Sequence, residues 1–277
     1  MFDRYRRKKM QNRYIRIMSI IMSLLLIMLS GGCKSKQVDN AVKQEITVFA
    51  ASSLTESLKE IIKLFEKENP EVKVKLNLDS TSRLRLQIEQ GVEGDVFFSA
   101  NKQHYDALKE EGYITKGQAL LYNSMVVIVP KDNPAHIQKV EDLQNKCKLV
   151  LALKEVPAGD YARKIIHSLS GKIGSEFEKK VLNNIVSEEN NVKQVVNKVV
   201  MGESDAAFVY SSDITQSVKD KVKVLEIEPE YNVRAEYFIG KLTNKNEKQY
   251  IEKVYAFLIG EEAQNIFKKY GFNHISE

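Results

Sequence analysis

Phe49-Ala50-Ala51-Ser52-Ser53-Leu54 is a junction where an apolar strand pattern runs into small residues and hydroxyls, and an amphipathic helix pattern follows at once. The first backbone N–H groups of a helix have no partner inside the helix, and the aligned peptide dipoles place about half a positive charge there. Such a junction favours an anion. Neither Lys nor Arg lies within it. We therefore predict an anion site made of neutral donors, and expect the same arrangement elsewhere in the chain.

Strand and helix patterns alternate along the chain from Glu45 onward. Strands are expected at 46–50, 72–78, 95–99, 125–129, 149–153, 206–210, 222–227 and 237–241. Helices are expected after Ser53, after 80–82, at 102–111, from Pro157, and at about 247–258 and 261–270. A further loop that leads into a helix is expected within 187–200. This alternation predicts an α/β fold with mixed, mostly parallel sheets flanked by helices, and the length favours two lobes.

The N-terminal segment has the pattern of a secretory signal. Basic residues precede an apolar run at 17–29, which is shorter than the roughly 20 residues that a membrane span needs. The run ends in Leu29-Ser30-Gly31-Gly32-Cys33, which resembles a bacterial lipobox. We predict a lipoprotein signal at 1–33 with lipidated Cys33, and a polar tether at 34–44. An ordinary cleaved signal with an incidental Cys is the alternative.

Charge argues against a nucleic-acid partner, and cysteine content argues against an intrachain disulfide. The chain has a formal net charge of +5, and removing 1–32 with its seven basic residues and Asp3 leaves −1. Sequence-independent binding to nucleic acid needs a surplus of Lys and Arg, so no nucleic-acid partner is expected. Besides Cys33 there is only Cys147, which predicts no intrachain disulfide and an incidental thiol.

Several stretches resemble, in order over nearly all of 45–273, the molybdate-binding proteins of bacterial ABC importers. They are Ile46-Thr47-Val48-Phe49-Ala50-Ala51-Ser52-Ser53-Leu54, Asp79-Ser80-Thr81, Gln87-Ile88-Glu89-Gln90-Gly91, Asp95-Val96-Phe97-Phe98-Ser99-Ala100, Val156-Pro157-Ala158-Gly159-Asp160-Tyr161-Ala162, Val209-Tyr210 and Ile266-Phe267-Lys268-Lys269-Tyr270-Gly271-Phe272. Each stretch is weak alone, but the combination is specific.

The resemblance implies a two-lobed fold of the periplasmic-binding-protein type, with crossover strands as a hinge. Lobe I would comprise 45–122 plus 234–277, and lobe II 123–233. Molybdate, and tungstate as well, would be held without a cofactor or direct metal ligation. The implied ligand residues are Ser53, Thr81, Ala158, Val192 and Tyr210, with Ser52, Ser80 and Asn191 beside them.

The resemblance also implies how the protein works in the cell. It would be a monomer outside the cytoplasm, anchored by lipid to the cell membrane, and it would deliver the anion to an ABC permease. Catalysis is not expected, because no proton transfer is involved in holding an oxyanion.

Other interpretations of these residues remain open. Hydroxyls at helix starts, such as those of Ser53 and Thr81, are also typical of plain helix caps. Tyr210 suits a half-buried core position, and Ala158 and Val192 suit loop or core positions. A different tetrahedral oxyanion such as sulfate is the alternative ligand. A secreted hydrolase using Ser53 is a further alternative, although no G-x-S-x-G motif occurs and His104, His136, His167 and His274 are scattered. The ligand-sensing domain of a transcription regulator is disfavoured by the secretion signal.

Some positions depart from the family pattern. Thr81 stands where Ser is usual, Arg83 stands where a small residue or Thr is common, and Phe238 replaces a frequent Pro. Arg83 is expected to face solvent or guard the rim of the cleft. The acidic residues near the implied loops must point away from a bound anion; these are Asp79, Asp160, Glu188 and Glu189.

Overall fold

The computed structural model describes residue 18 and residues 44–243 and 249–275. The predicted signal at 1–33, with Cys33, lies outside these residues apart from Met18, and so does the predicted tether apart from Gln44. Within the described ranges no helix combines the length and apolar character that crossing a membrane requires.

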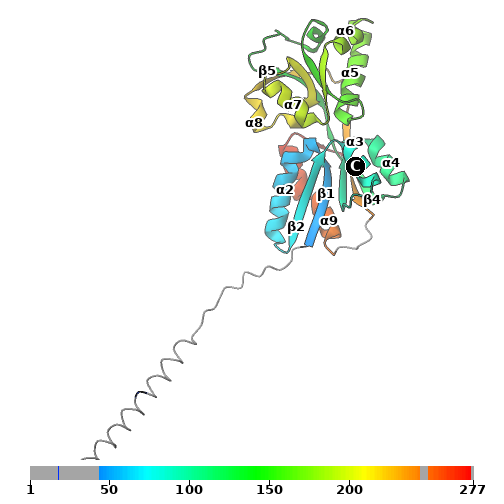
Figure 1. Ribbon diagram of the computed structural model, residues 1–277, viewed down its shortest axis with the longest axis vertical. Coiled ribbons are helices and arrows are strands. Elements are labelled where there is room, and N and C mark those ends of the chain that lie inside the picture. The colour runs from blue at the N-terminus through cyan, green and yellow to red at the C-terminus, as the bar shows by residue number, and fades with distance from the viewer. Residues whose placement is uncertain (1–17, 19–43, 244–248, 276–277) are drawn as a thin grey trace, which may run out of the picture. The chain divides into compact units, whose positions relative to one another are not determined.

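The first sheet has the strand order β11-β4-β10-β3-β1-β2 (Figure 1). Its strands are β1 (Gln44–Ala51), β2 (Val72–Asp79), β3 (Val96–Ser99), β4 (Ile114–Asn123), β10 (Ala235–Leu242) and β11 (Asn273–His274). The helices of this part are η1 (Ser52–Leu54), α2 (Thr55–Glu68), α3 (Thr81–Glu89), α4 (Lys102–Glu110), α9 (Ile251–Ile259) and α10 (Glu261–Lys269). We call this sheet with its helices lobe I.

The second sheet has the strand order β7-β6-β8-β5-β9. Its strands are β5 (Met125–Pro130), β6 (Leu149–Ala152), β7 (Ile185–Glu189), β8 (Ala206–Tyr210) and β9 (Val222–Glu226). Its helices are η2 (Val140–Gln144), α5 (Pro157–Ile173), α6 (Phe177–Asn183), α7 (Val192–Val200), η3 (Ser211–Asp213) and α8 (Gln216–Lys219). We call this sheet with its helices lobe II.

Both sheets are mixed, so the predicted α/β class with two mixed sheets is confirmed. Parallel pairing joins β2, β1 and β3 in one sheet and β7, β6 and β8 in the other, whereas β10, β4, β11, β5 and β9 pair antiparallel. Parallel pairing is thus less extensive than the sequence predicts, because strands from distant parts of the chain join each sheet antiparallel.

The chain passes between the lobes at Ser124 and again at 227–234. Asn232 ties these two crossings together, because its Oδ1 accepts from Met125 N over 3.2 Å and its Nδ2 donates to Met125 O over 2.8 Å. Strands β1 to β4 precede the first crossing, β5 to β9 lie between the two crossings, and β10 and β11 follow the second. This distribution supports the predicted division into 45–122 plus 234–277 and 123–233, which stays a prediction.

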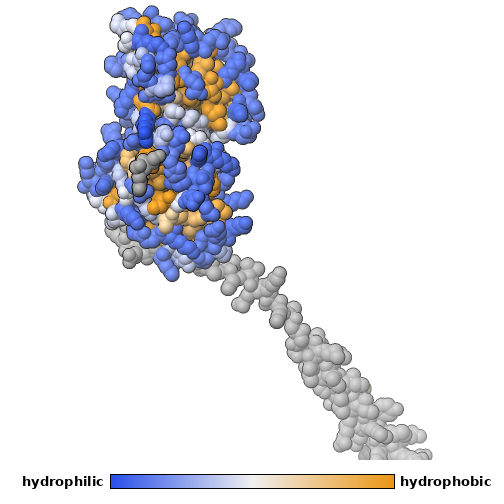
Figure 2. Space-filling model, turned by 180° about the vertical axis from the view of Figure 1, so that it is seen from behind, coloured by the Kyte–Doolittle hydropathy of each residue, from blue (hydrophilic) through white to orange (hydrophobic). Residues whose placement is uncertain are grey.

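Strand β1 is buried on both faces, as expected of a central strand covered by helices. Ile46 and Val48 lie in the larger apolar cluster with the stripe of α2, and Phe49 lies in a second cluster with Phe97 and Phe238. Figure 2 shows that hydrophilic residues cover most of one face of the molecule, with apolar residues visible between them. Burial of β1 brings the Ala51–Ser53 junction to the end of a rigid strand.

Candidate oxyanion-binding site

A small pocket lies where several helices of both lobes begin. Its lining consists of Ala51, Ser52, Ser53, Ser80, Thr81, Ala100, Val156, Pro157, Ala158, Val192 and Tyr210. Its cavity volume is about 10 Å³, on the scale of a single water molecule. A cavity of that size is too small for a sugar or a peptide.

All the residues that the sequence predicts as ligands lie in this lining: Ser53, Thr81, Ala158, Val192 and Tyr210. Ser52 and Ser80 lie there too, but Asn191 does not. The side chain of Asn191 caps α7 instead, accepting from Gln194 N over 3.1 Å, and it donates to Asp79 Oδ1 over 3.1 Å. Asn191 therefore positions the start of α7 and joins the two lobes beside the pocket.

The pocket is surrounded by helix starts. Ser53 lies in η1 just before α2, Thr81 begins α3, Ala158 is the second residue of α5, and Val192 begins α7. Backbone N–H groups at such positions lack partners within their helices and carry the positive end of the helix dipole. None of the lining residues, all within the described ranges, has a charged side chain. The helix starts therefore favour an anion at this pocket, although no lining side chain is a cation.

The hydroxyls of Ser53 and Thr81 are buried, and neither makes a capping hydrogen bond. Ser53 Oγ lies 2.8 Å from the Tyr237 hydroxyl, and Thr81 Oγ1 accepts a hydrogen bond from Ala100 N over 3.0 Å. The alternative that these two hydroxyls only cap helices is therefore wrong. The partner of Thr81, Ala100, lines the pocket as well, whereas Tyr237 is not among the lining residues.

Tyr210 ends strand β8, and its side chain is only 2% exposed. Its ring makes edge contacts with those of Tyr161 and Tyr237, at centroid distances of 6.5 and 5.9 Å. Within the described part of the chain, the Tyr210 hydroxyl has no hydrogen-bond partner. Burial raises the pKa of this hydroxyl well above its ordinary value, so it keeps its proton. A buried hydroxyl without a partner is costly, and a bound acceptor would remove that cost.

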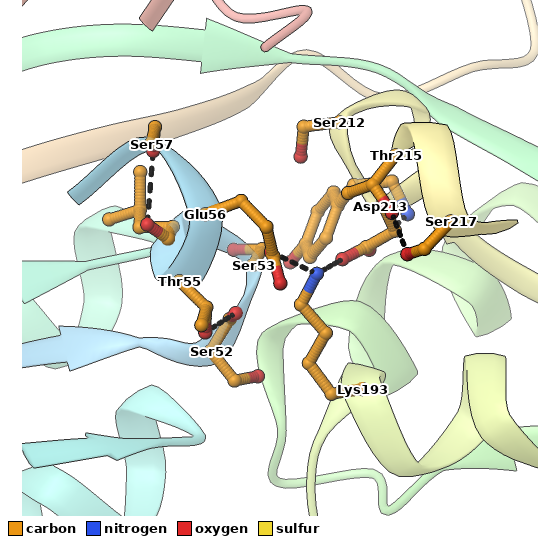
Figure 3. Close-up of polar contacts among 12 residues, drawn as sticks. Ser52, Ser53, Thr55, Glu56, Ser57, Lys193, Ser212, Asp213, Thr215 and Ser217 are labelled. Carbon is orange, nitrogen blue, oxygen red and sulfur yellow. Dashed lines mark hydrogen bonds and ion pairs between the residues drawn. The ribbon is translucent and has the colours of Figure 1, made fainter. Parts of the chain in front are cut away.

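Lys193 follows Val192 directly, but two carboxylates hold its ammonium group. Lys193 Nζ lies 2.8 Å from Glu56 Oε2 and 3.3 Å from Asp213 Oδ1, as Figure 3 shows. Burial acts to lower the pKa of Lys193, but Asp213 and Glu56 outweigh it and raise that pKa. Because Glu56 belongs to α2 and Lys193 to α7, this ion pair joins the lobes beside the pocket.

The acidic residues near the pocket have partners outside its lining, although Asp79 Oδ1 also accepts from Ser80 N over 2.8 Å. Asp79 pairs with Arg83 over 3.6 Å, and Asp160 pairs with Lys164 over 2.7 Å. Glu188 pairs with Arg163, and Glu189 accepts from Ser187 Oγ. The Arg83 side chain is 54% exposed, in agreement with the expectation that it faces solvent.

Tyr237 and Ala100, which contact the hydroxyls of Ser53 and Thr81, were not predicted as site residues. Both touch a predicted ligand residue from a distant part of the chain, and no local pattern marks such a contact. The hydrolase alternative finds no support in the lining, which contains neither a His nor a carboxylate beside Ser53. Among the described residues, no group of three or more His, Cys, Asp or Glu could hold a metal ion.

Comparisons with known proteins show the family of the chain. Residues 46–273 match the model of a family described as bacterial extracellular solute-binding protein. A Bacillus subtilis chain, provisionally named as the ABC transporter substrate-binding lipoprotein YvgL, is 32% identical over 257 residues, covering 91% of this chain and 96% of that one. The molybdate-binding protein ModA of Escherichia coli is 32% identical over 248 residues, covering 84% and 91%.

A solved structure is similar as well. It is the substrate-binding domain assigned to a molybdenum ABC transporter of Clostridium difficile, with a TM-score of 0.62 and 28% identity, covering 84% of this chain and 100% of that one. The similarity extends over both lobes.

Proposed function

Because the chain belongs to the bacterial extracellular solute-binding proteins, we propose that it captures molybdate, and tungstate as well, for import by an ABC transporter. It is a binding protein and not an enzyme. The relatives named for molybdate support the choice of ligand. The observation that carries the proposal is the charge-free pocket whose hydroxyls and helix starts converge from both lobes.

Physical costs explain why such a pocket suits a dianion. Taking the dianion from water costs several kcal/mol unless its oxygens are matched by donors. Six or seven hydrogen bonds to a charged acceptor, each worth about 1.5–3 kcal/mol, offset that cost. Ser53, Thr81 and Tyr210 would supply hydroxyls, and Ala158 and Val192 backbone N–H groups. An anion contacts the donors of both lobes only when the lobes are closed. Its binding therefore favours the closed state.

The proposal also covers the place of the protein in the cell. A lipidated Cys33 and a tether at 34–44 would hold a monomeric binding protein at the outer side of the membrane, where it delivers the anion to a permease. Lipid anchoring requires two lipid signals for stability, and a diacylated Cys supplies two acyl chains. Membrane fractionation tests this part, and a cytosolic protein would favour the transcription-regulator alternative.

Isothermal titration of residues 45–277 with molybdate, tungstate, sulfate and phosphate tests the ligand assignment. We expect tight binding of molybdate and tungstate, weaker binding of sulfate, and no binding of phosphate. Protonated phosphate needs an acceptor, which a pocket of donors does not offer. Sulfate binding tighter than molybdate binding would favour the second candidate, a sulfate-binding protein. Ester hydrolysis that is lost on Ser53→Ala would contradict the binding-protein assignment.

A further inference from the structure

Two side chains outside the pocket lining cross from one lobe to the other. His104 of α4 in lobe I reaches the backbone carbonyl of Glu155 in lobe II, with Nε2 and the oxygen 3.2 Å apart. The Tyr161 hydroxyl, from α5 in lobe II, donates to the backbone carbonyl of Ala100 in lobe I over 3.3 Å. A carbonyl oxygen can only accept. The direction of both bonds is therefore fixed, and Nε2 of His104 carries a hydrogen.

Both carbonyls belong to loops that form the pocket. Ala100 lines the pocket, and its N–H group donates to Thr81 Oγ1 over 3.0 Å. Glu155 directly precedes Val156, which lines the pocket and leads into the start of α5 with Ala158. Each bond therefore attaches a side chain of one lobe to a pocket loop of the other lobe. We call these two hydrogen bonds the clasp.

The imidazole of His104 has one nitrogen in the clasp and one without a partner. In a neutral imidazole only one of the two nitrogens carries a hydrogen. Because Nε2 carries it, Nδ1 is bare; this atom is buried, and among the described residues it has no hydrogen-bond partner. Protonation would place a second N–H group, on a charged ring, where nothing accepts from it. A buried charged donor without an acceptor is costly.

The surroundings of His104 favour its neutral form. Burial acts most strongly to lower the pKa of His104, and Arg85 of α3 acts in the same direction. The hydrogen bond to Glu155, and the carboxylates of Glu89 in α3 and Asp160 in α5, act to raise that pKa, but the net result is a lowered pKa. Strands β3, β4 and β10 also pack against α4, where they contribute residues of the second apolar cluster.

Opening of the lobes changes this balance. Because His104 and Glu155 lie on different lobes, opening separates them and exposes both imidazole nitrogens to water. A hydrated imidazole has its ordinary pKa of about 6.5. A state in which a group has a lowered pKa loses stability relative to the other state as the pH falls. Acid therefore favours the open arrangement, and the closed form takes up the proton only at its own lowered pKa.

We propose that His104 and Tyr161 are positioning residues whose clasp keeps the anion in the closed pocket, and that protonation of His104 speeds release of the anion in acid. This inference rests on the proposed oxyanion function. Neither residue lines the pocket, so the clasp acts through the Ala100 and Glu155 loops and not on the anion itself. Capture begins with open lobes, in which the clasp is not formed, so its rate should depend little on either residue.

Release of radioactive molybdate from the full chain, chased with excess unlabelled molybdate at pH 7.5 and at pH 5, tests the clasp. We expect release from the wild type to be about tenfold faster at pH 5. His104→Gln replaces the imidazole with an amide that can donate to the Glu155 carbonyl but does not titrate. This variant should release molybdate at nearly the same rate at both pH values. His167→Gln is the matched control, because His167 in α5 is exposed and pairs with Glu178, and it should keep the acceleration in acid. Equal acceleration in the wild type and in His104→Gln would contradict the role of His104.

Tyr161→Phe tests the second bond of the clasp. The substitution keeps the ring and its edge contact with Tyr210 and removes only the hydroxyl. Loss of one neutral hydrogen bond should speed release about two- to tenfold at both pH values, with the rate of capture nearly unchanged. Tyr255→Phe is the control, since Tyr255 in α9 is buried and its hydroxyl has no hydrogen-bond partner within the described ranges. An unchanged release rate in Tyr161→Phe, or slower capture that accounts for its whole loss of affinity, would contradict the clasp.

The outcomes separate the two proposals. A wild-type protein that binds no molybdate ends the proposed function and the inference with it. A wild-type protein that binds molybdate and releases it at one rate at both pH values contradicts only the clasp. Should the variants not fold, nitrogen NMR of the wild-type imidazoles at pH 5.5 decides. Neutral His104 in the molybdate-bound protein and protonated His104 in the free protein support the inference, and equal protonation in the two forms overturns it.

Discussion

Lys193 Nζ and Glu56 Oε2 lie 2.8 Å apart across the boundary between the lobes. The same ammonium group lies 3.3 Å from Oδ1 of Asp213, which is fully buried. The other carboxylate oxygen of Asp213 accepts a hydrogen bond from Tyr210 N. This cluster therefore connects the start of α2, the start of α7 and the strand end that carries Tyr210. The ion pair holds the two halves of the pocket in one arrangement.

Lys193→Met should destabilise the protein and weaken molybdate binding. The buried Asp213 would lose its cation, and breaking such a pair by removing one partner costs about 3 kcal/mol or more. Because the contact between the lobes is lost as well, molybdate affinity should also fall. Thermal unfolding and titration measure both effects. Lys198→Met is the control, because Lys198 lies in the same helix and its partner Glu203 is exposed. Equal effects of the two substitutions would contradict the structural role of Lys193.

Ser53→Ala should weaken molybdate binding by about ten- to a hundredfold. The estimate follows from the worth of one hydrogen bond to a charged acceptor, about 1.5–3 kcal/mol. Ser57→Ala is the control, since Ser57 is also buried near the start of α2 but its hydroxyl donates to Leu54 O. Titration calorimetry measures both affinities. A loss of similar size in Ser57→Ala would place the site elsewhere.

Gly159→Ala should disturb the pocket through the backbone. A Cβ at Gly159 would lie 2.1 Å from Leu153 O and 2.3 Å from Ala152 O, so the start of α5 must move away from β6. Ala158 and its N–H group would move with it, and both stability and molybdate affinity should fall. Gly171→Ala in the same helix meets nothing within 4 Å, and it should be neutral or stabilising. Melting temperatures that change equally in both variants would contradict this account.

Molybdate affinity should stay nearly constant from pH 6 to 9. Burial raises the pKa values of Tyr210 and Tyr237, so their hydroxyls remain protonated donors throughout. Burial also lowers the pKa of His104, which is therefore neutral over most of this range. Titrations at several pH values measure the profile. A steep change between pH 6 and 9 would assign binding to a titrating side chain instead.

The same tyrosines predict a loss of stability in alkali. A group whose pKa is higher in the folded state than in the unfolded state contributes stability below its unfolded pKa, and that stability is lost as the pH rises. For Tyr210 and Tyr237 the unfolded value is about 10. The free energy of unfolding should therefore fall above pH 10, which denaturant titrations at pH 9, 10 and 11 would detect.

Local patterns predicted most of the fold and two of the five candidate ligand residues. Strand ends followed by small residues and helix starts marked Ser53 and Thr81. These features depend on neighbours in sequence. The resemblance added Ala158, Val192 and Tyr210, which no local pattern distinguishes.

Other features depended on contacts that sequence patterns do not encode. Ser53 and Tyr237 are 184 positions apart, and Lys193 and Glu56 are 137 apart. Strand β4 also escaped prediction, because its burial does not alternate regularly and its pairing with β10 shifts register twice. The loop expected from Ser187 is part of strand β7, whose residues are only partly buried or exposed.

Diffraction at the molybdenum absorption edge from crystals grown with molybdate tests the central claim most directly, since it locates the metal without assumption. We predict one anomalous peak in the pocket, with oxygens that accept from the hydroxyls of Ser53, Thr81 and Tyr210 and from the N–H groups of Ala158 and Val192. An empty pocket, or molybdenum beside lysine side chains on the surface, would contradict capture by neutral donors from two lobes.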